Sequence, residues 1–326
     1  MIACVPLSSA FRLEGLALET SNGGEPEMSK KMEKVAVNGS GILGTQIAMM
    51  AVYGGYTVKI FDPQADAFSA TYNKLKNDLS SKGFTPFIPW DQWEKCKSSV
   101  QQAASLDEAV KDAQLVIEAA PENVELKNKI FAELGRIAPP DAILATNSSS
   151  IPVSRMEASS GRAERCLNIH FYFPLQGTNM VDIMGGSKTL PEVFQAGVDW
   201  IKSIGCIPLK VNKEILGFCF NRVWRAIKRE TLYMWGNGFV DYRDSDRGWM
   251  VFTKMNEGPF AIMDKVGLDV VYDIEMVYYK ESGDPKDKPP EALLEKIKRG
   301  ELGVKSGKGF YTYPNPEYMQ PDFLKD

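Results

Sequence analysis

A glycine-rich turn between a short β-branched strand and a helix constrains the fold of this chain more than any other feature. Residues 35–37 predict a strand, residues 42–53 a helix and residues 57–61 a second strand. The turn, residues 39–44 (GSGILG), fits the pattern G-x-G-x-x-G. Strand, helix and strand in this order form a βαβ unit, which implies a parallel sheet with a right-handed crossover.

The glycines of this turn, Gly39, Gly41 and Gly44, each have a physical role in binding a dinucleotide. The first permits the tight turn, the second lets the backbone approach a pyrophosphate, and the third lets helix and strand pack closely. Backbone amides of Ile42 and Leu43 open the helix, where the partial positive charge attracts phosphate. Glycines also occur in ordinary βα turns, which remain the alternative interpretation.

Asp62 ends the second predicted strand, 18 residues after the last glycine of the turn. An acid at this place accepts hydrogen bonds from the adenosine ribose hydroxyls and repels a 2′-phosphate. The next residues, Pro63 and Gln64, offer no arginine to bind such a phosphate. We therefore expect NAD as the cofactor rather than NADP.

Strands and helices continue to alternate as far as residue 211. This alternation predicts a doubly wound Rossmann-type α/β domain over residues 31–211. Short strands are expected at 115–119, 143–146, 166–170, 180–184 and 207–211, and helices at 66–82, 92–104, 124–138 and 190–203.

Beyond Gly217 the patterns are helical, without convincing strands. We expect residues 212–326 to form an all-helical C-terminal domain. Its helices are predicted at 218–238, 242–254, 258–266 and 270–281, and the glycine- and lysine-rich segment 303–313 is expected to be a loop that packs back on them.

Composition and charge exclude several classes of partner. A net charge of −4 gives no overall attraction for nucleic acid or an anionic membrane, and no apolar run approaches the about 18 residues of a membrane helix. The five cysteines form no C-x-x-C pair, which indicates neither a metal site nor a disulfide framework and favours a reducing compartment, the cytoplasm before the mitochondrial matrix. Residues 1–30 lack a basic start and are expected to be a disordered lead-in.

The single histidine, His170, is the first candidate for catalysis. It falls at the carboxyl end of a predicted strand, which is the edge where open α/β sheets bind their ligands. An imidazole can accept an alcohol proton near neutral pH while hydride leaves the same carbon. A lone histidine is more often structural, but its position beside a dinucleotide fold favours a catalytic role.

Three other polar residues are candidates for the same site. Asp182 lies inside an apolar strand and needs a partner if buried; it could orient His170, or equally cap a loop at the strand end. Ser149 follows a predicted strand and could bond a substrate oxygen, although hydroxyls there more often cap the next segment. Asn221 lies in an apolar helix start, where the second domain is expected to meet the first and ligands commonly bind.

These residues lie in segments that resemble a known family. The chain resembles the short-chain L-3-hydroxyacyl-CoA dehydrogenases over nearly its whole length after the lead-in. The matching segments are residues 35–62, 116–126 (VIEAAPENVEL), 146–151 (TNSSSI), 170–174 (HFYFP), 217–222 (GFCFNR), 258–260 and 303–311.

The resemblance implies a role for each candidate. His170 and Asp182 take the places of the family's catalytic pair, Ser149 that of a serine that contacts substrate, and Asn221 that of an active-site asparagine. The resemblance also implies a helical arm at about residues 66–104 that contacts the CoA end, and a C-terminal domain that forms a homodimer. Residues expected near the cofactor are Glu122, Lys127 and Asn147, and arm lysines expected near the substrate are Lys74 and Lys82.

Two residues depart from the family pattern. The acid that pairs with the histidine is usually glutamate, and Asp182 is one methylene shorter. The asparagine of the family's H-F-F-N-P string is here Phe173, which removes a polar group from the site. These changes leave the reaction type intact. With the shorter acid, either the backbone closes up or the histidine is less tightly oriented, and a narrower site could prefer a different substrate.

We expect NAD-dependent oxidation of an (S)-3-hydroxyacyl-CoA to the 3-oxoacyl-CoA, in fatty acid metabolism, with His170 as the base. One alternative is the same chemistry on a free 3-hydroxy acid of the carnitine, gulonate or hydroxybutyrate type. The arm lysines favour a phosphate-bearing thioester, but exposed lysines commonly form only a solvated helix face. A second alternative is a non-catalytic, crystallin-like NAD-binding protein, against which the complete set of site residues speaks.

Overall fold

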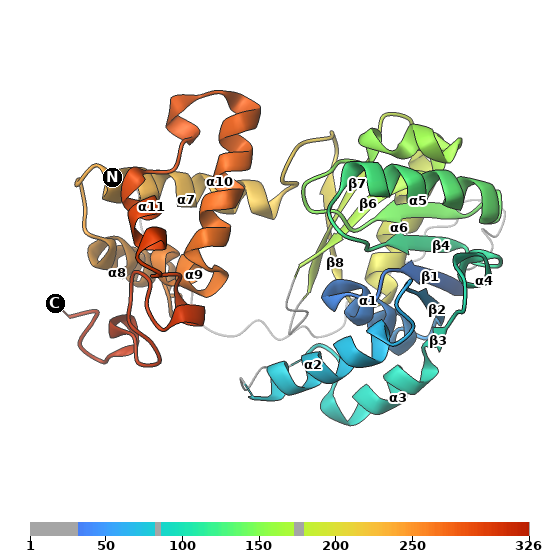
Figure 1. Ribbon diagram of the computed structural model, residues 1–326, viewed down its shortest axis with the longest axis horizontal. Helices are drawn as coiled ribbons and strands as arrows, with labels where there is room; N and C mark the ends of the chain where they lie inside the picture. Colours follow the sequence, from blue (N-terminus) through green and yellow to red (C-terminus); the bar gives the residue numbers. More distant parts are fainter. Residues whose placement is uncertain (1–31, 82–85, 173–178, 326) are drawn as a thin grey trace, which may run out of the picture. The chain divides into compact units, whose positions relative to one another are not determined.

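The computed structural model of the protein describes residues 32–81, 86–172 and 179–325. The expected lead-in at residues 1–30 lies outside the described residues, as do Lys82 and Phe173. One eight-stranded sheet precedes a series of helices (Figure 1). The strands are β1 (Lys34–Asn38), β2 (Thr57–Phe61), β3 (Gln101–Gln102), β4 (Leu115–Glu118), β5 (Ile143–Thr146), β6 (Cys166–Phe171), β7 (Met180–Gly185) and β8 (Ile207–Val211).

The order of the strands in the sheet is β3-β2-β1-β4-β5-β6-β7-β8. Helices alternate with these strands along the chain, so the predicted Rossmann-type fold is confirmed. The helices of this region are α1 (Ile42–Tyr53), α2 (Ala67–Ser81), α3 (Trp93–Ser99), α4 (Leu106–Val110), α5 (Val124–Ile137) and α6 (Pro191–Ser203). The short helix α4 was not predicted; Ser105 caps its start by accepting a hydrogen bond from the backbone N–H of Glu108.

One pair of strands departs from the expected parallel arrangement. All neighbours from β3 to β6 are parallel, whereas β7 runs antiparallel to β6 and parallel to β8. Only residues 172–179 connect β6 to β7, and a parallel connection needs a crossover of about a dozen residues or more. In the resulting register His170 lies directly opposite Asp182.

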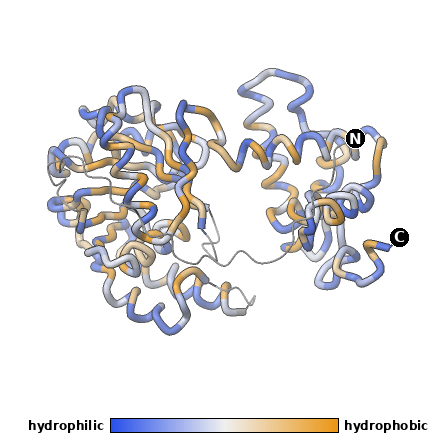
Figure 2. The backbone as a smooth tube through the Cα atoms, turned by 180° about the vertical axis from the view of Figure 1, so that it is seen from behind, coloured by the Kyte–Doolittle hydropathy of each residue, from blue (hydrophilic) through white to orange (hydrophobic). Residues whose placement is uncertain are grey.

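Apolar side chains cover both faces of the sheet, and Figure 2 shows the hydrophobic stretches running through its strands. On one face, Ala36, Val116 and Leu144 join a buried cluster with residues of α4 and α5. On the other, α6 lies so close that a side chain at Gly197 would come within 2.7 Å of Ile183. Alternation along β6 places His170 on the same face as Cys166, a member of the first cluster.

Residues 67–99 contain two helices that pack against each other. The hydroxyl group of Tyr72 in α2 donates to Glu94 in α3 over 2.8 Å, and its ring lies 5.8 Å from that of Trp93. The helix expected over residues 92–104 ends at Ser99, because the chain then pairs with β2 as the short strand β3. Backbone bonding to the sheet edge overrides the local helical pattern there.

The helices beyond the sheet form a region with its own core. They are α7 (Phe220–Gly236), α8 (Tyr242–Thr253), α9 (Pro259–Val266), α10 (Leu268–Ser282) and α11 (Glu291–Lys298). The buried cluster includes Leu232, Phe260, Val271 and Phe310. The all-helical character of this region was predicted, whereas α11 was not.

A fully buried aspartate, Asp264, fixes the glycine-rich loop to this core. Its carboxylate accepts hydrogen bonds from the backbone N–H groups of Phe310 and Tyr311, over 2.8 and 2.9 Å, and from the hydroxyl of Tyr313. Burial raises the pKa of the Asp264 carboxyl, although these donors act against the rise. The loop packs back on the helices, as the sequence predicted.

The substitution Asp264→Ala is expected to destabilise the fold strongly. It leaves two buried backbone N–H groups and a phenol without an acceptor, which should cost about 3–5 kcal/mol of the free energy of unfolding. Urea denaturation at neutral pH measures this. The matched control is Asp269→Ala, which removes a partly exposed ion pair with Lys305 and should cost at most about 1 kcal/mol. Equal, small losses in the free energy of unfolding for both variants would show that Asp264 does not fix the loop to the helices.

Candidate active site

The loops after β1, β4 and β5 and the end of β6 enclose a crevice of about 280 Å³. It lies at the carboxyl edge of the parallel strands, where open α/β sheets bind their ligands. The glycine turn, Glu122, Lys127, Asn147 and His170 therefore meet in one place. The lining residues are Gly41, Ile42, Leu43, Ala119, Ala120, Glu122, Lys127, Asn147, Ser148, Ser149 and His170.

The geometry of the glycine turn fits a dinucleotide. Gly39 has a φ of +106°, and a side chain there would lie 2.6 Å from the carbonyl oxygen of Ala119. A side chain at Gly44 would lie 2.0 Å from the carbonyl oxygen of Gly39, so both glycines are required by packing. At Gly41 a side chain would meet nothing within 4 Å, which leaves the space that a pyrophosphate needs. Within the described residues no side chain caps the start of α1, so its N–H donors can face an anion.

Asp62 lies beside the turn but outside the crevice, in a small hollow of its own. One carboxylate oxygen accepts from the backbone N–H of Ser40 over 2.8 Å and the other from that of Gln64 over 2.9 Å. These bonds hold the carboxylate while leaving each oxygen a lone pair for a ribose hydroxyl. No lysine or arginine is among the described residues that line this hollow, which suits NAD rather than NADP.

A buried ion pair that the sequence analysis missed supports the floor of the crevice. The ammonium group of Lys127 lies 2.7 and 2.9 Å from the two carboxylate oxygens of Glu118, and both side chains are almost completely buried. Glu118 also accepts from the hydroxyl of Thr146 and the N–H of Ala120. The pair therefore ties the ends of β4 and β5 to α5. An acid inside an apolar strand was the signal that could have indicated Glu118.

Glu122 holds the serine loop that follows β5. Its carboxylate accepts hydrogen bonds from the hydroxyl groups of Ser148 and Ser150, and Lys127 lies 3.4 Å away. Burial acts to raise the pKa of Glu122, but these bonds and the nearby charge outweigh it and keep the pKa below its usual value. The hydroxyl of Ser149 lies at the crevice, exposed and without a hydrogen bond to any described residue.

His170 and Asp182 face each other across the antiparallel pair of β6 and β7. The Nδ1 atom of His170 lies 3.4 Å from Oδ2 of Asp182, which is longer than an ordinary hydrogen bond. The hydroxyl of Tyr172 donates to the same Oδ2, and the other oxygen, Oδ1, has no hydrogen-bond partner among the described residues. Asp182 is completely buried in the middle of β7 and does not cap a loop.

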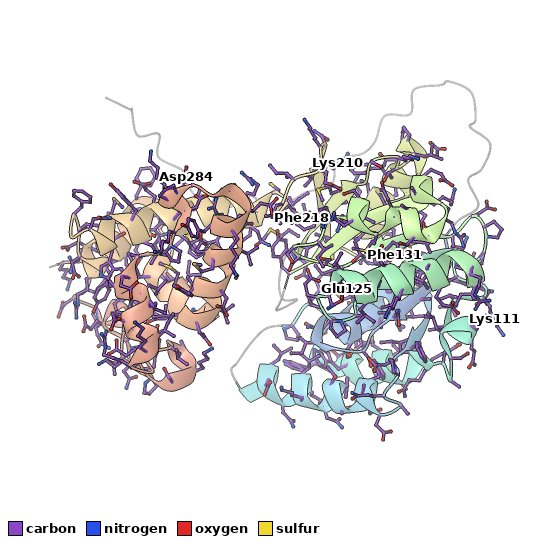
Figure 3. All side chains as sticks on the ribbon, turned by 45° about the horizontal axis from the view of Figure 1, so that its top comes forward. Lys111, Glu125, Phe131, Lys210, Phe218 and Asp284 are labelled. Carbon is purple, nitrogen blue, oxygen red and sulfur yellow. The ribbon has the colours of Figure 1, made fainter. Side chains whose placement is uncertain are left out.

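An aromatic ring covers one face of the imidazole. Phe218, labelled in Figure 3 on the chain between β8 and α7, stacks on His170 with ring centroids 5.0 Å apart and planes 8° from parallel. The φ of Phe218 is +51°, which is unusual for a bulky residue, and the preceding residue, Gly217, has a φ of +82°.

Asn147 holds the end of β6. Its side-chain oxygen accepts a hydrogen bond from the N–H of Phe171 over 2.9 Å.

Asn221 and Lys74 are not brought to the crevice. Asn221 is half-buried at the start of α7 and does not line the crevice, and Lys74 is exposed on α2.

Within the described part of the chain, no three histidine, cysteine, aspartate or glutamate side chains are placed to hold a metal ion. The described helices also include none that is long and apolar enough to cross a membrane.

Comparison with known proteins agrees with this geometry. Residues 34–215 match the NAD-binding domain of 3-hydroxyacyl-CoA dehydrogenases, and residues 217–313 match the C-terminal domain of the same family. The 3-hydroxybutyryl-CoA dehydrogenase of Bradyrhizobium diazoefficiens is 30% identical over 286 residues, which cover 88% of this chain and 97% of the relative.

Solved structures show the same similarity. An (S)-3-hydroxybutyryl-CoA dehydrogenase from Ralstonia eutropha is 28% identical with a TM-score of 0.75, covering 87% of this chain and 100% of the other. A diketoreductase is 32% identical with a TM-score of 0.77 and the same coverage. The chain therefore belongs to the 3-hydroxyacyl-CoA dehydrogenase family and is an NAD-dependent oxidoreductase.

Proposed function

We propose that this protein oxidises an (S)-3-hydroxyacyl-CoA to the 3-oxoacyl-CoA with His170 as the general base. One observation carries the proposal: the only histidine of the chain lines the same crevice as the glycine turn, with a buried carboxylate behind it. The relatives from Bradyrhizobium and Ralstonia are named as 3-hydroxybutyryl-CoA dehydrogenases, which supports a short acyl substrate.

The two nitrogens of His170 have different roles in this mechanism. Nδ1 faces Asp182, so in the neutral ring it carries the hydrogen, and Nε2 is left to take the proton of the substrate hydroxyl. The buried carboxylate then stabilises the imidazolium that forms. NAD⁺, when bound, supplies the acceptor for the hydride at its nicotinamide ring.

The chain offers two candidates to orient the substrate oxygen, Ser149 and Asn221. We assign the first contact to Ser149, because its hydroxyl is at the crevice and free of other hydrogen bonds within the described residues. Asn221 does not line the crevice, so its side chain would have to approach the substrate from the start of α7. The cofactor would lie along Gly39, Gly41, Ile42, Leu43 and Gly44 with its adenosine ribose at Asp62, and beside Glu122 and Asn147.

The same chemistry on a substrate without CoA is the second candidate. The exposed Lys74 does not line the crevice, and Lys127, the one lysine among the described residues that do, is paired with Glu118. The diketoreductase relative is described as acting on dicarbonyl compounds. A free 3-hydroxy acid therefore remains a specific alternative.

Replacement of the base tests the mechanism directly. His170→Gln should lower kcat for oxidation by about 10²–10⁴-fold, the usual contribution of a positioned acid or base. The dissociation constant for NADH, measured by fluorescence, should stay within about twofold because the glycine turn is untouched. Near-normal turnover by this variant would refute the role of His170.

A substrate panel separates the two candidates. NADH formation is followed with 3-hydroxybutyryl-CoA, free 3-hydroxybutyrate and carnitine at equal concentrations, and kcat/KM is expected to be at least about 100-fold higher for the thioester. Turnover of a free acid alone would favour the second candidate. Tight NADH binding without turnover of any compound would support a non-catalytic protein.

We further propose that the helical region pairs two copies of the chain. Val270, Ile274 and Val277 follow one face of α10 at i, i+4 and i+7, and all three are exposed, as is Phe252 on α8. A row of exposed apolar side chains along one helix face, such as that of α10, is typical of a protein interface.

Sedimentation velocity should therefore detect a species of twice the 36.3 kDa chain mass. Val277→Glu would bury an unpaired charge in the interface and should weaken association at least about tenfold. The control is Met319→Glu, which places the same charge at an exposed apolar residue near the C-terminus. This variant should leave the association constant unchanged. A wild-type chain that stays monomeric would contradict the proposal.

A further inference from the structure

The phenol of Tyr172 and the imidazole of His170 meet the same oxygen of the same carboxylate. The Tyr172 hydroxyl donates to Oδ2 of Asp182, and Nδ1 of His170 lies 3.4 Å from that atom. The ring of Tyr172 also meets the imidazole edge-on, with centroids 4.6 Å apart and planes at 69°. These three side chains form a triad of base, acid and phenol.

We propose that Tyr172 is a positioning residue that holds the Asp182 carboxylate in line with His170. The inference rests on the proposed function, in which His170 is the base. Tyr172 does not line the crevice, so it acts on the reaction through Asp182 and not by touching the substrate.

A third side chain is needed because that of Asp182 is short. The register of β6 and β7 fixes His170 and Asp182 as directly opposed residues, so their backbones cannot approach further. From there the short side chain leaves 3.4 Å between Oδ2 and Nδ1, too far for a strong hydrogen bond to restrain the carboxylate by itself. The bond from Tyr172 supplies the missing restraint.

The position of Tyr172 suits this role. It lies two residues after His170, which places both side chains on the same side of the chain where β6 ends. Its ring is held by an edge contact with Phe220, with centroids 5.6 Å apart. Burial raises the pKa of Tyr172, so the phenol keeps its proton and acts towards the carboxylate only as a donor.

The same hydrogen bond affects the charge that faces the base. The phenol donates to Oδ2 of Asp182, the oxygen that also faces Nδ1 of His170. Loss of this donor leaves the negative charge of the carboxylate facing the imidazole alone. The other titratable groups nearby are Cys219, which precedes α7, and Glu122 and Lys127, which line the crevice.

The first test removes only the hydroxyl group. Tyr172→Phe should lower kcat about tenfold with little change in KM, and should move the acidic limb of the pH profile of kcat/KM upward by about one unit, as expected for a lost charge-assisted bond. The matched control is Tyr56→Phe, whose hydroxyl bonds to Ser203 elsewhere on the sheet domain and which should behave as wild type. A ring that merely fills space would leave both kcat and the pH profile of Tyr172→Phe unchanged.

The second test lengthens the side chain of the acid by one methylene group. Asp182→Glu alone should be impaired, because the longer side chain meets the phenol. Tyr172→Phe combined with Asp182→Glu should regain activity to within about threefold of wild type, because the glutamate reaches Nδ1 unaided and the hydroxyl no longer obstructs it. Losses that simply add in the double variant would overturn the proposal.

The two hypotheses fail in different ways. If His170→Gln is inactive while Tyr172→Phe equals wild type at every pH, the role of Tyr172 is refuted and the function stands. If His170→Gln keeps its turnover, the proposed function fails and the Tyr172 proposal fails with it. The far-ultraviolet circular dichroism spectrum and the NADH binding of each variant, expected to match wild type, separate either result from misfolding.

Discussion

The antiparallel pairing of β6 with β7 is the constraint on which the site depends. It alone makes His170 and Asp182 directly opposed residues, although twelve positions separate them in the chain. In a parallel pair the two residues would come from strands joined by a long crossover, and their register would depend on how that crossover packs. The antiparallel ladder instead sets the distance between the imidazole of His170 and the carboxylate of Asp182.

On the other side of the crevice, a buried ion pair holds the loops in place. The Glu118–Lys127 pair is removed from water, so its stability depends on complete hydrogen bonding, which Thr146 and Ala120 provide. The pair adds no net charge to the floor of the crevice. Glu122 then attaches the serine loop to this support, so the loop beside the crevice is held by hydrogen bonds.

Much of the fold could be predicted because the strands and helices carry clear local signals. The bounds of α1, β2 and β5 agree with the expected ranges, since strand patterning and the glycine turn determine them. The antiparallel direction of β7 and the early end of α3 were not predicted. The first follows from the short connection between β6 and β7, and the second depends on pairing with β2, which lies far back in the sequence. For the site, the crevice contains the glycine turn and His170 as expected, whereas Glu118, Tyr172 and Phe218 were missed. Their roles come from side-chain contacts between different strands, helices and loops, which the local pattern of residues does not specify.

The short strand β3 has a consequence for how this protein can change over time. The arm formed by α2 and α3 leaves the sheet after β2 and rejoins it beside the same strand. Its entry and exit are thus pinned together at the rim, and the core strands do not depend on what lies between. Insertions or deletions in the arm can therefore accumulate there without altering the strands that carry His170 and Asp182.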